Sequence, residues 1–306
     1  LFGSCNSTIR GNIATNNDHG GFYLVGEASN TSITNNTATN NCVGFYFCGS
    51  DYSNVTGNIA TNNHIGFYSW GGCLFNFLGN TATGNTYGFL LLVANVINLA
   101  NNIARENDYG FYLESCYRNN LTGNIATGND YYGFFLNDSW YNSLTNNTAT
   151  DNIYGFHLGY SRYNNLTGNN AKRNIYGFHL SDDSNKNKLT GNFATKNIFG
   201  FYLSKNSREN YLANNTATGN IYDYFENPSG ELFLIFSLFF YLSPQSWIFN
   251  WNWLILALTA SVIFALLSRR KGRRNRIDRY DTEKHETEEF YFNEYGEIIR
   301  RRKNEF

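Results

Sequence analysis

Residues 119–136 read Asn-Asn-Leu-Thr-Gly-Asn-Ile-Ala-Thr-Gly-Asn-Asp-Tyr-Tyr-Gly-Phe-Phe-Leu, and this pattern returns along three quarters of the 306-residue chain. Its Gly-Phe pair recurs at steps of 22 or 23 residues. The pairs begin at Gly21, Gly44, Gly66, Gly88, Gly110, Gly133, Gly155, Gly177 and Gly200, and Asp223-Tyr224 is a degenerate further copy. An Asn-x-Ala unit and an aliphatic residue before it keep the same period. The chain is therefore built from repeated copies of one short unit.

Each unit holds three short apolar segments separated by Asn, Gly, Ser and Thr. Segments of this length are too short for helices and have the composition of strands and turns. Antiparallel hairpins are disfavoured, because the chain contains no Asn-Gly or Asp-Gly dipeptide. We therefore predict an all-β fold over residues 1–230: a single-stranded parallel β-helix with three strands per coil of 22–23 residues. Its coils, about ten of them, would stack about 4.8 Å apart.

Such stacking turns every repeat position into a column of like side chains. We expect the Phe column inside the coil, facing the small Ala column, so that large and small residues complement each other. Two Asn columns are expected to form hydrogen-bonded ladders of amides: the Asn of each Asn-x-Ala unit, and the Asn three positions before each Gly, such as Asn107 and Asn152. Asp18 and Asp130 interrupt the second of these columns. A carboxylate cannot donate, so the sequence predicts that these two turns are weaker or bind a cation.

Over residues 1–226, and most clearly at 119–136, the chain resembles the right-handed parallel β-helix repeat proteins. That class includes pectate-lyase-like enzymes and the NosD-type periplasmic copper-protein accessory family, and residues 119–136 are similar to the repeat consensus of the latter. The resemblance implies a right-handed coil. The residues that match are those of the structural columns, so the resemblance implies a fold more than an activity.

The C-terminal part of the chain has a different composition. Trp247 to Leu267 is a segment of 21 residues without a charge, and residues 269–276 after it are strongly basic. This length spans about 30 Å as a helix, the thickness of a membrane core, and basic residues remain on the cytoplasmic side. We predict a single transmembrane helix at 247–267, with the β-helix outside the cell and residues 268–306 as a flexible cytoplasmic tail that touches anionic lipid.

Residues 231–246 are predicted to form a cap for the coil and a juxtamembrane segment. The alternative is a helical hairpin made with the anchor, which would place both termini on one side. The chain begins at Leu1 and contains no Met, so we expect the sequence to be processed or truncated at its front.

An outward aromatic column is the first candidate binding surface. The expected ligand-binding residues are Tyr23, Tyr46, Tyr68, Tyr112 and Tyr202, because aromatic rows on a flank can stack on sugar rings. The alternative is that the row only stabilises the sheet. His157 and His179 occupy this column on adjacent turns, about 5 Å apart, and are candidate ligands for a soft metal such as copper. Two histidines make only half a site, so ordinary surface histidines are the alternative.

Carboxylates are the candidate catalytic residues. A polysaccharide-cleaving enzyme needs paired carboxylates, or a carboxylate-bound calcium beside a basic residue. Asp108, Asp130 and Asp151 lie on three successive turns, but at different offsets from the Gly, which predicts a diagonal arrangement. A solvated edge without catalysis is the alternative.

Charge and cysteine content limit the remaining functions. The net charge of -1 does not favour nucleic acid as a partner, the five Cys show no CxxC spacing, and we expect no cofactor. Nine Asn-x-Ser/Thr sequons suit a glycosylated exterior rod. The leading hypothesis is a non-catalytic, membrane-anchored surface rod whose partners are glycans or cell-envelope proteins. A carbohydrate-active lyase or hydrolase is the alternative, and NosD-like metal handling is the third.

Overall fold

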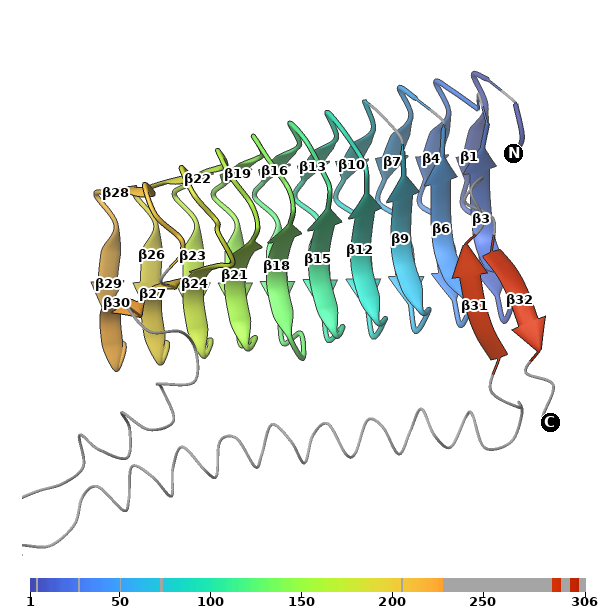
Figure 1. Ribbon diagram of the computed structural model, residues 1–306. Coiled ribbons are helices and arrows are strands. Elements are labelled where there is room, and N and C mark those ends of the chain that lie inside the picture. Colours follow the sequence, from blue (N-terminus) through green and yellow to red (C-terminus); the bar gives the residue numbers. More distant parts are fainter. Residues whose placement is uncertain are drawn as a thin grey trace, which may run out of the picture. The chain divides into compact units, whose positions relative to one another are not determined.

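The computed structural model describes residues 1–3, 5–26, 28–49, 51–71, 74–204 and 206–227 and two strands near the end of the chain. The chain divides into two compact units, Leu1–Glu231 and Leu232–Phe306. Within the first unit the strands form three parallel sheets of ten strands each (Figure 1). Every strand pairs with the strand three places along the chain, so one turn contributes one strand to each sheet.

The first and second sheets are made of strands of three residues. The first sheet contains β1 (Thr8–Arg10), β4 (Ser32–Thr34), β7 (Asn54–Thr56), β10 (Asn76–Leu78), β13 (Asn98–Ala100), β16 (Asn120–Thr122), β19 (Ser143–Thr145), β22 (Asn165–Thr167), β25 (Lys188–Thr190) and β28 (Tyr211–Ala213). The second sheet contains β2 (Ile13–Thr15), β5 (Thr37–Thr39), β8 (Ile59–Thr61), β11 (Thr81–Thr83), β14 (Ile103–Arg105), β17 (Ile125–Thr127), β20 (Thr148–Thr150), β23 (Asn170–Lys172), β26 (Phe193–Thr195) and β29 (Thr216–Thr218).

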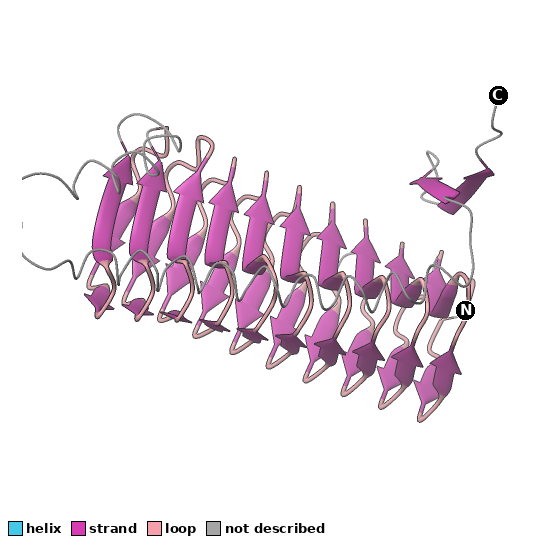
Figure 2. Cartoon of the chain, turned by 90° about the horizontal axis from the view of Figure 1, so that it is seen from below, coloured by secondary structure: helices cyan, strands magenta, loops and turns pink. Residues whose placement is uncertain are grey.

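The third sheet is made of strands of six residues. It contains β3 (Gly20–Val25), β6 (Val43–Cys48), β9 (Ile65–Trp70), β12 (Tyr87–Leu92), β15 (Tyr109–Glu114), β18 (Tyr132–Asn137), β21 (Tyr154–Gly159), β24 (Tyr176–Ser181), β27 (Phe199–Ser204) and β30 (Tyr222–Asn227). Figure 2 shows the strands of successive turns lying side by side along all three sheets. The coil is a right-handed parallel β-helix of about ten turns, as predicted.

Three corners join the sheets within each turn. The first corner leads from the first sheet to the second, the second corner from the second to the third, and the third corner back to the first sheet. Only the first corner keeps a constant length: five positions separate the inward-facing apolar residue of the first sheet from the inward-facing Ala of the second sheet at every turn, as from Leu99 to Ala104. The extra residues of the longer turns fall in the other two corners, which flank the long strands of the third sheet.

The core is a stack of phenylalanine rings. Successive Phe rings lie 4.7–4.9 Å apart and nearly parallel, as for Phe89–Phe111 at 4.7 Å and Phe111–Phe134 at 4.8 Å. From Phe45 to Phe201 these side chains are fully buried, together with the Ala column from Ala38 to Ala194, in one hydrophobic cluster. Burial of each ring is worth about 2–3 kcal/mol, so the periodic Phe residues are explained by stability alone.

Each Gly before a core Phe is required by space. A Cβ atom at Gly110 would lie 2.6 Å from the carbonyl oxygen of Gly133 on the next turn and 3.0 Å from the Asn129 amide nitrogen. The same approach repeats along the Gly column. Any side chain there would push two turns apart, which accounts for the regular Gly-Phe pair.

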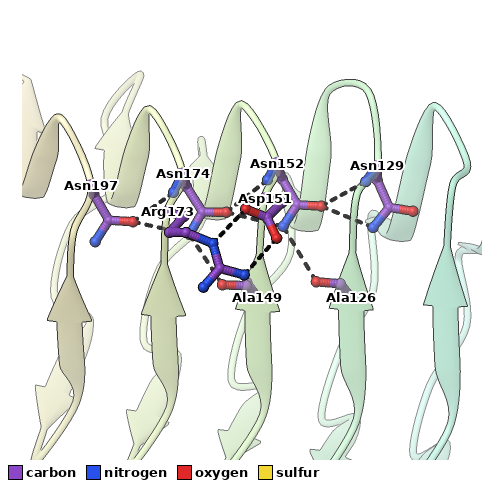
Figure 3. Close-up of polar contacts among 8 residues, drawn as sticks. All are labelled: Ala126, Asn129, Ala149, Asp151, Asn152, Arg173, Asn174 and Asn197. Atoms are coloured by element: carbon purple, nitrogen blue, oxygen red, sulfur yellow. Dashed lines mark hydrogen bonds and ion pairs between the residues drawn. The ribbon is translucent and has the colours of Figure 1, made fainter. Parts of the chain in front are cut away.

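Asparagine ladders line the corners. At the first corner, the Asn124 amide nitrogen donates to Asn147 Oδ1 at 3.0 Å and to the Leu99 carbonyl at 2.8 Å. Its Oδ1 accepts from the backbone and side-chain nitrogens of Asn102. Each buried amide therefore forms hydrogen bonds with polar groups on the turns before and after it, as the sequence predicted. Figure 3 shows the same pattern at the second corner, where Asn129 donates to Asn152 Oδ1 at 2.9 Å.

The predicted interruptions of the second-corner ladder are wrong. Asn17 and Asn129 occupy the ladder positions instead of Asp18 and Asp130, and Asn17 donates to Asn41 Oδ1 at 2.7 Å. The extra residue of each of these turns lies between the ladder Asn and the Gly, so the corner loop lengthens while the amide stays in register. A one-residue bulge costs less than a broken row of buried hydrogen bonds.

A third ladder was not anticipated from the sequence. It runs along the third corner through the later turns, where Asn119 donates to Asn142 Oδ1 at 3.1 Å. Its members are Asn119, Asn142, Asn164, Asn187 and Asn210. Their spacing of 22 or 23 residues was the available signal.

The second unit is described only at β31 (Glu288–Phe292) and β32 (Ile298–Arg302). These strands pair antiparallel, with Glu288 opposite Arg302 and Tyr291 opposite Ile299, so the flexible tail expected from the sequence contains a hairpin. The predicted cap at 231–246 and the predicted span at 247–267 lie outside the described residues. Within the part of the chain that is described, no helix has the length and apolar character needed to cross a membrane.

Candidate functional site

The outer face of the third sheet is an aromatic wall made of two columns. One column contains Tyr87, Tyr109, Tyr132, Tyr154, Tyr176, Phe199 and Tyr222, and the other contains Tyr23, Tyr46, Tyr68, Leu90, Tyr112, Phe135, His157, His179, Tyr202 and Phe225. Rings of the two columns contact one another, as for Tyr132–Phe135 with centroids 4.6 Å apart. Rings of the wall therefore contact each other across the two columns as well as from turn to turn.

The expectation that the second column is exposed is wrong. Tyr46, Tyr68 and Tyr202 are buried, the last with 1% of its surface exposed, while Tyr23 and Tyr112 are partly buried. Burial is the main reason that the pKa of Tyr68 rises to about 12. Alternation along a strand predicts which side chains point outward, but neighbouring columns decide whether they remain accessible. These tyrosines stabilise the wall and offer little surface to a ligand.

His157 and His179 are buried members of the wall, so the reading as surface histidines is also wrong. Their rings stack with centroids 4.6 Å apart, and His179 is 1% exposed. Burial lowers the pKa of His179 to about 3, and burial together with the neighbouring His179 lowers the pKa of His157 well below its usual value. Both imidazoles are therefore neutral near pH 7.

A hydrogen-bonded chain leads from His157 to the third corner. His157 Nε2 lies 2.8 Å from Ser181 Oγ, and that hydroxyl donates to Asp182 Oδ2 at 2.8 Å. The Ser181 hydroxyl has one proton and donates it to the Asp182 carboxylate, so it can only accept from His157. His157 therefore carries its proton on Nε2, which assigns its tautomer. Its Nδ1 has no hydrogen-bond partner among the described residues. Within that same part of the chain, no group of three or more His, Cys, Asp or Glu is placed to hold a metal ion.

The three candidate aspartates do not lie on one diagonal. Asp108 and Asp130 directly follow the ladder residues Asn107 and Asn129, so they share one column on adjacent turns. Asp151 precedes its ladder residue and lies in another column. There it forms a two-point ion pair with the exposed Arg173 of the next turn, at 2.8 and 2.7 Å (Figure 3). The structure thus brings two of the three together and gives the third a cationic partner.

A group of exposed aromatic residues lies instead at the third corner, between the long strands and the first sheet. We call Tyr117, Trp140, Tyr141, Tyr160 and Tyr163 the aromatic corner. All but the partly buried Tyr117 have 42–55% of their surface exposed. Tyr141 and Tyr163 stack with centroids 4.9 Å apart and planes at 6°, and Tyr117 meets Tyr141 edge-on at 5.2 Å.

Basic side chains flank these rings. The Arg118 guanidinium lies 4.9 Å from the centroid of Tyr117, and the Lys186 ammonium lies 5.7 Å from that of Tyr163. Lys186 also lies 3.6 Å from Glu209, so the corner carries both signs of charge. Sequence reasoning missed this surface because it followed the Gly-Phe register. The pair Tyr141 and Tyr163, 22 residues apart, was the signal.

The backbone of the aromatic corner is strained. Tyr141, Tyr160 and Tyr163 have φ values of 56°, 52° and 57°, in the left-handed region that suits Gly and Asn. A bulky residue there costs about 1–2 kcal/mol. Strain of this kind is retained where surrounding structure imposes it, and it concentrates at binding sites.

Comparison with solved structures supports the architecture. The A-module of the mannuronan C-5 epimerase AlgE4 from Azotobacter vinelandii has a TM-score of 0.57 and 14% identity, covering 74% of this chain and 79% of that one. The AlgE6 A-module from the same organism has a TM-score of 0.58 and 15% identity, covering 71% and 77%. At these identities the likeness establishes the fold alone. No curated protein matches the sequence.

The family match covers almost the whole coil. Residues 1–76 and 74–228 match the family described as periplasmic copper-binding protein (NosD). These ranges include all thirty strands of the first unit, with their Gly-Phe, Asn-x-Ala and aliphatic columns. The repeat that predicted the fold is therefore also what relates this chain to other proteins, and the chain belongs to the NosD family.

Proposed function

We propose that the coil is a non-catalytic rod outside the cytoplasm that binds glycans through its aromatic corner. The observation that carries the proposal is the exposure of Trp140, Tyr141, Tyr160 and Tyr163 on adjoining turns in a strained corner. The family description as periplasmic and the action of the AlgE modules on mannuronan, a polysaccharide, support it.

Exposed Tyr and Trp suit this role physically. They present a large apolar face at a low cost in side-chain entropy and keep a polar edge for hydrogen bonds. A sugar ring has the complementary character, with C–H groups on its faces and hydroxyls at its rim. Tyr117, Tyr141 and Tyr163 lie on three successive turns, about 4.8 Å apart, so a glycan lying along this part of the corner meets a ring at each of these turns.

The same proposal includes the predicted organisation of the chain. Residues 1–230 form the exterior rod, 231–246 a cap and juxtamembrane segment, 247–267 a single span and 268–306 a cytoplasmic tail. The uncharged segment and the basic run after it support this order. Protease added to intact cells should remove the coil and leave the tail protected. Protection of the coil would contradict the arrangement.

The copper-binding description of the family does not fit the residues described here. The two histidines stack inside the wall, and one uses its Nε2 on Ser181. The chain contains no Met, and the Sγ of the buried Cys116 lies 3.3 Å from the Leu91 and Glu114 carbonyl oxygens. We assign no metal step to this protein.

One observation favours a second candidate, a carbohydrate-active enzyme. Asp108 and Asp130 share a column on adjacent turns, so their backbones are about 5 Å apart, which allows the two carboxylates to approach the spacing found in a retaining glycosidase. Turnover of a polysaccharide by the full chain, abolished by Asp130→Asn, would establish this candidate and displace the binding rod.

A glycan array with the full chain tests the binding proposal. Trp140→Ala and Tyr141→Ala should each weaken binding at least about tenfold, since aromatic residues at the centre of a contact dominate its energy. Phe193→Ala removes an equally exposed ring from the second sheet and is the matched control, expected to leave affinity unchanged. Equal losses for all three variants, or no glycan bound by the parent chain, would reject the aromatic corner as the site.

A further inference from the structure

The nine sequons of the chain fall into distinct structural environments. Three lie within the short strands of the first sheet, at Asn54 in β7, Asn120 in β16 and Asn165 in β22. We propose that these three asparagines are N-glycosylation sites of the folded rod. This inference rests on the exterior location proposed above, because glycan transfer to Asn takes place outside the cytoplasm.

Strand geometry presents each of these sequons outward. In a strand, residues i and i+2 share a face, so the Asn and the Thr of each sequon point to solvent together. The residues between them, Val55, Leu121 and Leu166, are fully buried and anchor the strand. The three Asn side chains are exposed. A glycan on this face projects away from the core without displacing it.

Hydrogen bonding leaves the amide nitrogens available. Thr167 Oγ1 donates to Asn165 Oδ1 at 3.1 Å, and Asn76 Nδ2 donates to Asn54 Oδ1 at 3.0 Å. The side-chain nitrogens of Asn54 and Asn165 donate to no partner within the described residues. Asn120 Nδ2 donates one hydrogen to Asn98 Oδ1 at 3.2 Å and keeps the other.

Three other sequons, at Asn35, Asn137 and Asn146, are committed to the fold. At Asn137 the required hydroxyl belongs to Ser139, which is fully buried and donates to the Leu113 and Asn137 carbonyls. Asn35 and Asn146 occupy the first corner with positive φ, and each Oδ1 lies over the backbone of a glycine on the next turn. A glycan on either amide would disturb the corner that carries the ladder.

One neighbour favours Asn54 further. Tyr52 lies two residues before it at positive φ with 58% of its surface exposed, so its ring is free to cover the first sugar. Asn54, Asn120 and Asn165 belong to turns three, six and eight of the first sheet. Their glycans are therefore separated by about 14 Å and about 10 Å, which leaves room for each.

In the transfer step, the donor is a glycan linked to a polyprenyl diphosphate. The Asn Nδ2 forms a bond to C1 of the first sugar while the bond from C1 to the diphosphate oxygen breaks. The polyprenyl diphosphate leaves with that electron pair, and the amide loses one proton.

Glycopeptide sequencing of the full chain, secreted from a cell that transfers such glycans, tests the assignment. We expect high occupancy at Asn54, Asn120 and Asn165 and at least tenfold lower occupancy at Asn137. Thr167→Val keeps the shape of the strand and should remove the glycan from Asn165 alone. In Tyr52→Ala the rise in melting temperature that the Asn54 glycan produces should shrink.

Three outcomes would overturn the assignment: bare Asn54, Asn120 and Asn165, occupancy at Asn137 equal to that at Asn165, or a secreted Thr167→Val that still carries the Asn165 glycan. Glycosylation of the three asparagines and glycan binding by the aromatic corner can fail independently. Failure of glycan binding on the array, with the three sites occupied, would reject the aromatic corner and leave the acceptor sites standing.

Discussion

The first and third corners of the coil make the same kind of turn with different residues. At the first corner the left-handed position holds only Gly or Asn at every turn: Gly11, Asn35, Gly57, Gly79, Asn101, Gly123, Asn146, Gly168, Gly191 and Asn214. At the third corner the left-handed positions hold Gly or Asn at some turns, as at Gly49 and Asn30, and bulkier or charged residues at others, as at Tyr141, Val93 and Lys186. The first corner also keeps one length, whereas the third takes insertions. The first corner is built for stability, and the third retains strained side chains that face solvent.

Breaking the first-corner ladder should give the largest effect on stability. Asn124→Ala removes a fully buried amide that donates to Leu99 and Asn147 and accepts from Asn102, leaving several buried groups without partners. We expect a loss of about 3–5 kcal/mol in the free energy of unfolding, measured by urea denaturation of the full chain. Asn120→Ala, at an exposed position four residues earlier, is the control and should cost under about 0.5 kcal/mol. A small effect at Asn124 would mean that the ladder is not what sets the stability of this corner.

The histidine pair should make the region next to the third corner sensitive to acid. The pKa of both imidazoles is lower in the folded chain than the usual value near 6.5, so the unfolded chain binds more protons as the pH falls through 6.5. Stability is therefore full above that value and is lost toward the folded pKa, which is about 3 for His179. Between about pH 7.5 and pH 5.5 the loss from His179 is about 1.4 kcal/mol, and His157 adds a loss of the same sign.

Replacing both histidines should flatten this dependence. His157→Phe and His179→Tyr copy the residues found on the turns before and after them in the same column. Urea denaturation at several pH values should show the slope in the parent chain and little of it in the double variant. His19→Phe, at an exposed histidine, is the matched control and should keep the parent slope. An unchanged slope in the double variant would assign the acid sensitivity to other groups.

Exchanging residues between the corners should give the smallest effects, with opposite signs. Val93, at φ 52° and 52% exposed, is strained, so Val93→Gly should stabilise the chain by about 0.5–1 kcal/mol. Gly191, at φ 63° with no atom near an added Cβ, allows the converse test without a clash. Gly191→Val should destabilise by about 1 kcal/mol. Thermal denaturation of both variants measures the two changes in stability. Changes of the same sign would refute the contrast between the corners.

The candidate site was less predictable than the fold. The Gly-Phe register predicted the coil, the Phe stack and the first-corner ladder, because each depends only on equal spacing along the chain. It misplaced Asp130, since the ladder takes Asn129 and lets the corner bulge. It also placed Tyr46, Tyr68 and Tyr202 on an open surface, because alternation along a strand says nothing about the column beside it.

The sequence by itself determined the parallel coil, since residues repeated every 22 or 23 positions can bury their apolar faces and pair their amides only by stacking in register. Only the tertiary structure decided which outward residues meet solvent. Exposure depends on packing between columns and on which corner contains an inserted residue, and the repeat spacing predicts neither. Packing between its two columns buries much of the aromatic wall, whereas the side chains of the aromatic corner remain exposed.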